Sequence, residues 1–167
     1  MLTKNIFALD QASQTSGWAF FEKGELKDWG KFTFDGDIAD RLVAIRAEII
    51  KLINKYNINF VAFEDIQMQG NVTNNVQTFK ILSEVFGVIL ETVRELNIDY
   101  DIVPSVTWKS TLGIKGRTRP EQKRNAQQYV LDTYNVKAIQ DTCDAICIGA
   151  HILSNKKSPK VEGFSWD

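Results

Sequence analysis

The stretch that decides the fold lies near the start of the chain and reads Ile6-Phe7-Ala8-Leu9-Asp10-Gln11-Ala12-Ser13-Gln14-Thr15-Ser16-Gly17-Trp18-Ala19. Its first four residues form an unbroken apolar run, which indicates a buried strand over 6–9 that ends in an acid, Asp10. The next two aromatic-rich segments, 17–21 and 25–34, are separated by a short connection that contains a glycine. This pattern predicts an antiparallel hairpin. We therefore expect a sheet that begins with three antiparallel strands.

The rest of the chain alternates between helical and strand patterns. Apolar residues recur three or four apart over 38–56 and 75–96, which predicts two helices, whereas short apolar runs at 60–63 and 100–103 predict strands. Two more helices are expected over 119–134, where Thr118-Arg119-Pro120-Glu121 resembles a capping box, and over 141–153. This order predicts an α/β fold with a mixed five-stranded sheet, an antiparallel meander plus parallel strands, flanked by helices.

Length and composition indicate one globular domain. The 167 residues are 44% hydrophobic and 25% charged, and we expect a domain over 1–154 followed by a polar tail over 155–167. No run approaches the length of a membrane span, so no membrane partner is expected. The first residues lack the apolar core of a signal peptide, and two cysteines four residues apart make no disulfide framework. We therefore expect a cytoplasmic protein.

Four acids border strongly apolar segments: Asp10, Glu64, Asp141 and Asp144. Two of them end predicted strands, and the other two share one face of the last predicted helix because they lie three residues apart. A single acid at such a position is more often a strand end or a helix cap. Four together are costly beside a core unless a divalent cation such as Mg²⁺ or Mn²⁺ binds them, and two such ions can hydrolyse a phosphodiester. Asp65 should point away from this group, because it follows Glu64 on an extended chain.

The positive charge is concentrated in one part of the chain. The net charge is −1, yet residues 104–124 carry one acid and six basic residues, namely Lys109, Lys115, Arg117, Arg119, Lys123 and Arg124. Two interpretations remain open from the charges alone: a phosphate-binding surface, or a solvated loop and helix face.

Three motifs, in order, carry a resemblance to a known family. They are the opening stretch 6–19, the segment Phe63-Glu64-Asp65-Ile66-Gln67-Met68, and Asp141-Thr142-Cys143-Asp144-Ala145. Together they resemble the RuvC family of Holliday junction resolvases, within the ribonuclease H-like superfamily, over roughly residues 5–153. No single motif is specific, but three in this order and spacing are.

The resemblance implies a ribonuclease H-like fold and a crossover junction endonuclease that acts in DNA recombination and repair by metal-dependent paired nicking. It implies a homodimer through the helix at 75–96. We expect the protein in a bacterial host cell, and its compact chain and relaxed motifs would suit a phage-borne version. Lys109 would be catalytic, near the scissile phosphate, and either Lys123 or Lys115 would be a second functional lysine. The resemblance implies that two Mg²⁺ or Mn²⁺ ions would be held by Asp10, Glu64, Asp141 and Asp144. DNA would be bound by Lys115, Arg117, Arg119, Lys123 and Arg124.

Two departures from the family pattern affect substrate preference. Gln11-Ala12 replaces the usual Pro-Gly after the first acid, and Gln67 stands where members often place an aromatic residue. We therefore predict a resolvase with relaxed sequence preference, which cuts four-way junctions and also forks and other branches.

Other functions, and one other type of site, would share some of these sequence features. A ribonuclease H-like nuclease for RNA precursors or RNA–DNA hybrids would use the same acids and stays the alternative. A catalytically dead DNA-binding module should lack some of the acids, and an actin-like ATPase needs a second lobe. Cys143, Cys147 and His151 recur every four residues, but no fourth Cys or His exists to complete a zinc site. The two cysteines are therefore interpreted as buried apolar residues, and His151 is assigned neither as a metal ligand nor as a catalytic residue. Trp108 is interpreted as a core residue, with base stacking as its other possible role.

Overall fold

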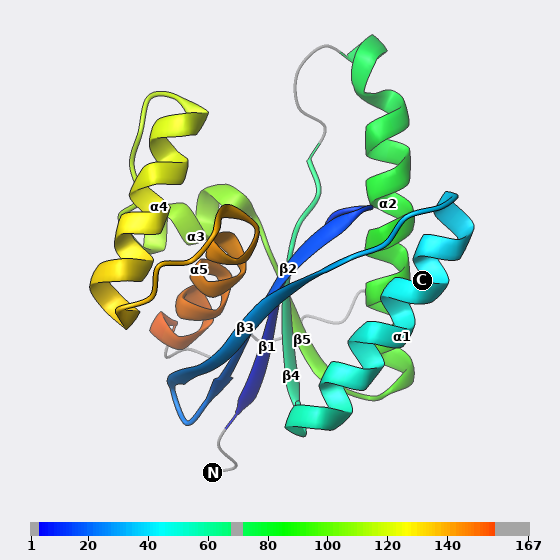
Figure 1. The fold of residues 1–167 in the computed structure, drawn as a ribbon, viewed down its shortest axis with the longest axis horizontal. Helices are drawn as coiled ribbons and strands as arrows, with labels where there is room; N and C mark the ends of the chain where they lie inside the picture. Colours follow the sequence, from blue (N-terminus) through cyan, green and yellow to red (C-terminus); the bar gives the residue numbers. More distant parts are fainter. Residues whose placement is uncertain (1–3, 68–71, 156–167) are drawn as a thin grey trace, which may run out of the picture.

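The computed structural model describes residues 4–67 and 72–155 and contains a five-stranded sheet in the order β3-β2-β1-β4-β5 (Figure 1). Strand β1 pairs antiparallel with β2 and parallel with β4, β2 pairs antiparallel with β3, and β4 pairs parallel with β5. The strands are β1 (Asn5–Asp10), β2 (Thr15–Glu22), β3 (Glu25–Thr33), β4 (Phe60–Glu64) and β5 (Asp99–Val103). The predicted mixed sheet, a meander extended by parallel strands, is confirmed.

Helices cover both faces of the sheet (Figure 1). One face carries α1 (Ile38–Tyr56) and α2 (Val72–Glu95), and the other carries α3 (Ser105–Thr111), α4 (Arg119–Tyr134) and α5 (Gln140–Ser154). The seven-residue α3 was not predicted, whereas the four longer helices were. Within the described ranges, no helix combines the length and the apolar character that a membrane crossing needs. The predicted tail lies, from residue 156 onward, outside the described residues.

The predicted capping box sets the start of α4. The Thr118 hydroxyl accepts a hydrogen bond from the backbone N–H of Glu121 at 3.3 Å, and Pro120 lies in the first turn. The first backbone N–H groups of a helix have no partner inside the helix, so such a side chain stabilises its first turn. The helix ends at Tyr134, followed by Asn135 in the left-handed conformation that commonly ends helices.

Alternation along β1 and β4 decides which side chains meet which helices. In β1, Phe7 and Leu9 join the core under α1 and α2, while Ile6 and Ala8 join the core under α5. Because successive side chains in a strand point to opposite faces, Asp10 belongs to the α5 face. The same alternation in β4 puts Glu64 on that face, and the parallel register pairs the residues just before the two acids, Leu9 and Phe63. The sheet therefore brings Asp10 and Glu64 side by side.

Glycines let α5 lie directly on β2. A Cβ added at Gly17 would lie 1.5 Å from the backbone carbonyl oxygen of Asp141, and one added at Gly149 would lie 2.1 Å from the ring of Phe21. Neither position can carry a side chain unless the helix or the ring moves. The acidic start of α5 is thus pressed against the strand that pairs with β1.

The residues weighed as a zinc site are buried instead. Cys143 and Cys147 are free thiols, and a hydrogen bond with Cys143, together with burial, raises the pKa of Cys147. His151 is buried between two partners, since its Nδ1 lies 2.9 Å from the Thr111 hydroxyl and its Nε2 lies 3.1 Å from the Asn155 amide nitrogen. The interpretation of the two cysteines as core residues is confirmed.

Candidate active site

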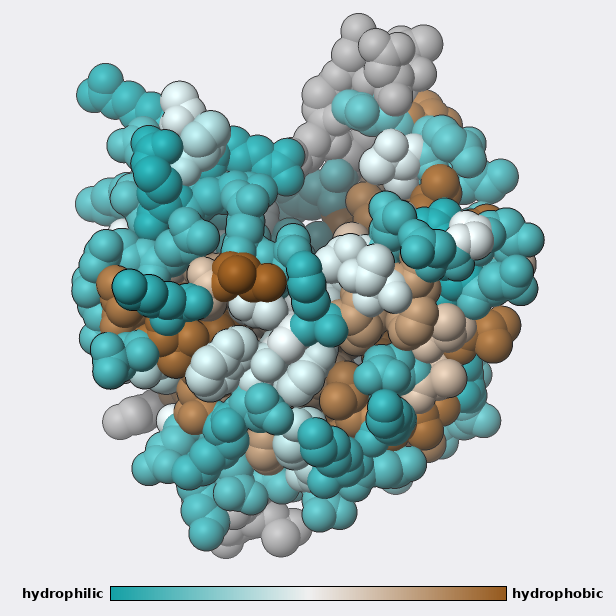
Figure 2. Space-filling view, in the orientation of Figure 1, coloured by the Kyte–Doolittle hydropathy of each residue, from teal (hydrophilic) through white to brown (hydrophobic). Residues whose placement is uncertain are grey.

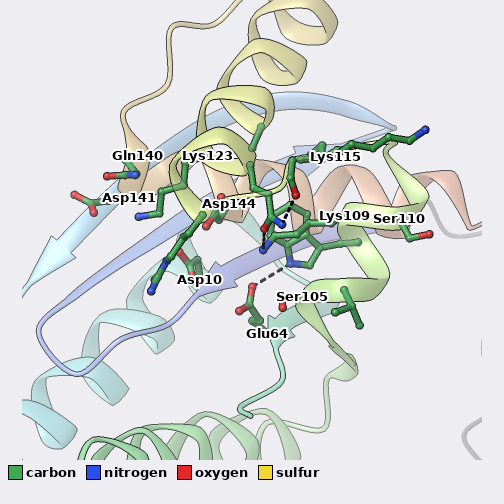
Figure 3. A pocket seen from close by; sticks show the side chains of 17 residues that line it. Asp10, Glu64, Ser105, Lys109, Ser110, Lys115, Lys123, Gln140, Asp141 and Asp144 are labelled. Atoms are coloured by element: carbon green, nitrogen blue, oxygen red, sulfur yellow. Dashed lines mark hydrogen bonds between the residues drawn. The ribbon is translucent and has the colours of Figure 1, made fainter. Parts of the chain in front are cut away.

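All four predicted acids line one cavity of about 770 Å³ between the sheet edge, α3, α4 and α5 (Figure 3). Asp10 ends β1, Glu64 ends β4, and Asp141 and Asp144 lie in the first turns of α5. The opposite wall carries positive charge from α3, α4 and the loop between them: Lys109, Lys115, Arg119 and Lys123. Figure 2 shows the surface notched between the α4 side and the α2 side, with hydrophilic residues bordering the notch on the α4 side. The cavity thus joins a carboxylate cluster to a cationic rim.

Without a bound cation, the surroundings of the four acids disfavour their ionised form. Burial raises the pKa of Asp10 well above its usual range, and the nearby carboxylates of Asp144, Glu64 and Asp141 raise it further, against the opposing effect of Lys123. Burial also raises the pKa of Glu64 and of Asp144. A bound cation would favour the ionised carboxylates by the same electrostatics.

The donor chemistry of the cluster suits a hard cation. Its four donor groups are carboxylates, and hard divalent cations such as Mg²⁺ and Mn²⁺ prefer oxygen ligands. Among the described residues, no three His, Cys, Asp or Glu side chains converge as the ligands of a preformed metal site. Asp141 is turned toward the edge of the site, where its Oδ2 lies 3.4 Å from the Lys31 ammonium on β3. The carboxylates repel one another when no cation neutralises them, which is a physical reason why they do not converge as ligands here.

Glu64 has two partners that the sequence analysis did not foresee. The indole N–H of Trp108 donates to Glu64 Oε2 at 3.0 Å (dashed in Figure 3). The side-chain amide of Gln11 pairs with the Glu64 backbone, since its Nε2 donates to the Glu64 carbonyl at 2.5 Å and its Oε1 accepts from the Glu64 N–H at 3.1 Å. Trp108 is 1% exposed, so the core interpretation is confirmed. A buried indole N–H usually has a hydrogen-bond acceptor. The prediction that Trp108 is buried was therefore the one sequence signal that pointed to such a contact.

Lys109 is held at the cavity wall by neighbours on both sides. Its ammonium donates to Gln122 Oε1 at 3.2 Å and lies 5.3 Å from the centre of the Trp108 ring. Gln122 is fixed in turn, because its Nε2 donates to the Gly116 carbonyl at 3.0 Å. The amide and the ring together restrict where the Lys109 charge can lie.

The structure gathers most, but not all, of the predicted basic residues. Lys115, Arg119 and Lys123 line the main cavity, and Figure 3 shows Lys123 extending from α4 toward the acids. Arg124 joins Arg119 and Lys123 around an adjoining hollow of about 390 Å³. Arg117 lines neither of these two hollows, although its backbone N–H donates to Glu121 Oε2 at 2.8 Å.

Asp65 lies outside the cavity lining, as alternation along the strand predicts. Its carboxylate accepts a hydrogen bond from the backbone N–H of Ile66 at 2.9 Å. The neighbouring acid therefore serves the local backbone and adds no ligand to the cluster.

Comparison with curated proteins finds relatives that match nearly the whole chain. No family model matches the chain. A crossover junction endodeoxyribonuclease RuvC of Ehrlichia canis is 25% identical over 153 residues, which span 86% of this chain and 92% of that protein. Another, from Halothermothrix orenii, is 25% identical over 163 residues, spanning 91% of this chain and 96% of that protein. The similarity to RuvC proteins therefore covers nearly the whole chain. This agrees with the three motifs of the sequence.

Solved structures share the fold of this chain. Thermus thermophilus RuvC in complex with a Holliday junction substrate matches with a TM-score of 0.70 at 12% identity, covering 87% of this chain and 90% of that one. The fowlpox virus resolvase, in complex with Holliday junction DNA, matches with a TM-score of 0.55 at 13% identity, covering 89% of this chain and 96% of that one. The predicted ribonuclease H-like fold is confirmed.

Proposed function

We propose that this chain is a metal-dependent endonuclease that resolves four-way DNA junctions by paired nicking. The observation that carries the proposal is the single cavity in which four carboxylates face a cationic rim. Phosphodiester hydrolysis needs both features, because the acids bind cations and the basic groups bind the phosphates on either side of the scissile bond. The similarity to crossover junction endodeoxyribonucleases selects branched DNA as the substrate.

Asp10, Glu64, Asp141 and Asp144 are the proposed ligands of two divalent cations, Mg²⁺ or Mn²⁺. When bound, such ions supply an activated water and stabilise the leaving oxygen. Support for the assignment comes from the oxygen-only donor set and from the raised pKa of Asp10, which is caused first by burial and then by the neighbouring carboxylates. Asp141 must exchange its contact with Lys31 for the cation, and this frees the Lys31 ammonium for a phosphate.

Lys109 is the proposed catalytic cation of the chain itself. It lines the same cavity as the acids, and Gln122 and the Trp108 ring hold its charge there. A fixed ammonium beside the cluster would stabilise the extra negative charge that develops on a phosphate under attack. This role differs from that of a flexible surface lysine, which contributes mainly to binding.

DNA would follow the basic wall of the cavity. Lys115, Arg119 and Lys123 would contact phosphates next to the cut, and Arg124, in the adjoining hollow, would contact a phosphate farther along the strand. Arg117 lies outside both hollows and is proposed only as an outer contact. Such contacts depend strongly on salt and are insensitive to sequence. Gln67, in place of an aromatic residue, supports relaxed sequence preference, with forks as further substrates.

A homodimer would provide the two active sites that paired nicks require. Helix α2 offers the surface for it: Val76 is 50% exposed, and the apolar side chains of Phe79 and Leu82, which follow along the helix, are half-buried. A twofold dimer through α2 fits a substrate of approximate twofold symmetry. We place this activity in the cytoplasm of a bacterial host, as the bacterial relatives suggest, with a phage genome as one origin of the chain.

The proposal is tested by cleavage of a labelled immobile four-way junction in Mg²⁺ or Mn²⁺, beside linear duplex, a fork and an RNA–DNA hybrid. We expect symmetric nicks in opposing strands of the junction that disappear in EDTA and in the Asp10→Asn variant. If the protein cuts the hybrid but not the junction, the junction assignment is overturned. The same acids would then belong to a nuclease that acts in RNA processing.

A further inference from the structure

The Glu64 carboxylate is oriented by a hydrogen bond from the buried indole N–H of Trp108. Trp108 is 1% exposed, and its indole N–H points at Glu64 Oε2 from 3.0 Å. An indole N–H donates and cannot accept, and leaving it unpaired in the interior would be unfavourable. The contact occupies one oxygen of the carboxylate. It therefore fixes the rotation of the side chain and leaves the other oxygen for a ligand in the cavity.

The Glu64 backbone is held independently by Gln11, which is 8% exposed. The Glu64 N–H and carbonyl both point toward β1, where the strand has just ended at Asp10, and the two polar atoms of the Gln11 amide pair with them. On the other side, the Asp65 N–H donates to the Val103 carbonyl at 3.0 Å and keeps this segment on β5. The Gln11 side chain thus extends the hydrogen bonding between β1 and β4 by one further pair of bonds, next to the two acids.

We propose that Gln11 and Trp108 are positioning residues for Glu64, with Gln11 fixing its backbone and Trp108 its carboxylate, so that one Glu64 oxygen is held ready for a divalent cation. This inference rests on the proposed function, in which Glu64 is a metal ligand. Neither residue touches the reacting phosphate in this scheme. Groups that orient a ligand in this way typically contribute about 10–100-fold to metal affinity.

The first test measures Mn²⁺ binding to the DNA-free protein by the loss of the free-ion EPR signal. Trp108→Phe removes the donor and keeps an aromatic ring, and Gln11→Met removes both amide contacts at similar length. Each variant should bind Mn²⁺ about 10–100-fold more weakly than the wild type. Two variants serve as matched controls. Trp18→Phe alters a buried indole that packs on Phe7, and Gln14→Met removes an exposed contact with Asp35. Both controls should bind Mn²⁺ as the wild type does.

A second readout follows the contact itself in the wild type, so it does not depend on how well a variant folds. In a ¹⁵N-labelled sample, the Trp108 indole resonance is identified by its loss in Trp108→Phe. Titration with Mg²⁺ should shift this resonance and leave that of Trp18 in place, because only the Trp108 indole is bonded to the proposed ligand.

Glu64→Gln separates failure of the inference from failure of the proposed function. If Glu64→Gln weakens Mn²⁺ binding while Trp108→Phe and Gln11→Met bind normally, Glu64 remains a ligand and the positioning role is overturned. An equal loss in Trp18→Phe would also overturn it, by showing a general packing effect. If Glu64→Gln binds Mn²⁺ as the wild type does, or if the wild type binds none, the metal assignment of the proposed function fails.

Discussion

Replacing Gly17 with alanine should disable the active site although all four acids keep their side chains. The new Cβ would lie 1.5 Å from the Asp141 carbonyl oxygen and 2.6 Å from its carbonyl carbon. Real Cβ atoms essentially never approach another heavy atom within 3.0 Å, so the start of α5 has to move away from β2 by about 1.5 Å. The obstacle is backbone rather than a flexible side chain, so no rotamer change removes it. The movement carries Asp141 and Asp144 away from Asp10.

The expected size of the effect follows from that displacement. Overpacking of this kind typically costs about 1–3 kcal/mol, which for a chain of this length lowers Tm by roughly 2–12 °C. Activity should fall much further, because a misplacement of about 1 Å in an active site can slow catalysis about 100-fold. We therefore expect the Gly17→Ala variant to fold and to nick at least about 100-fold more slowly.

The assay is single-turnover nicking of the four-way junction, at a temperature well below the Tm of the variant. Gly149→Ala is the matched control, because its Cβ would lie 2.1 Å from the Phe21 ring, toward the other end of the same helix. It should lose comparable stability and much less activity. Wild-type nicking by Gly17→Ala, or an equal loss of activity in both variants, would refute the argument that backbone contact at Gly17 sets the spacing of the acids.

Three further predictions concern the charged groups. Asp10→Asn and Glu64→Gln should each abolish nicking and leave junction binding largely intact in a gel-shift assay; a wild-type rate in either would remove that acid from the metal site. Lys109→Ala should slow single-turnover cleavage more than it weakens binding, whereas a pure binding defect would make Lys109 only a phosphate anchor. Without metal, the folded state raises the pKa of Asp10, so it holds this proton more tightly than the unfolded state does. The stability this contributes is present below the unfolded-state pKa of about 4 and is lost as pH rises through the folded-state pKa. The Tm of Asp10→Asn relative to wild type should therefore rise with pH in EDTA, and added Mg²⁺ should stabilise the wild type more at higher pH. A difference in Tm that stays constant with pH would contradict this linkage.

The elements that the sequence predicted well are those with local signals. Apolar spacing set the bounds of α1, and the Thr118 capping box set the start of α4. Helix α3 was missed because its seven residues are too few for a periodic pattern, and its apolar residues Val106 and Trp108 do not recur at helical spacing. Pro104 just before it was the remaining signal, since proline is favoured where a helix begins.

The acids of the candidate site could be predicted, but the groups that orient them could not. Asp10 and Glu64 each follow an apolar run, which is a local pattern. The partners of Glu64 are distant in sequence, with Gln11 separated from it by 53 positions and Trp108 by 44. Gln11 even looked like a simple departure from the family pattern. Its role depends on the parallel register of β1 and β4, which only the folded sheet reveals.

The glycine contacts beneath α5 also limit how the ion preference of the proposed metal site could change. At Gly17, helix and strand already touch through backbone atoms, so the distance between the acids of α5 and those of the strands is at its lower limit. Any side chain introduced there would only widen the proposed metal site, which would favour larger cations such as Ca²⁺ over Mg²⁺. Moving α5 cannot make the site narrower, because α5 and β2 are already in contact at Gly17. A narrower site requires longer acids, so selection for a smaller ion would have to act through Asp-to-Glu changes rather than through the packing of the core.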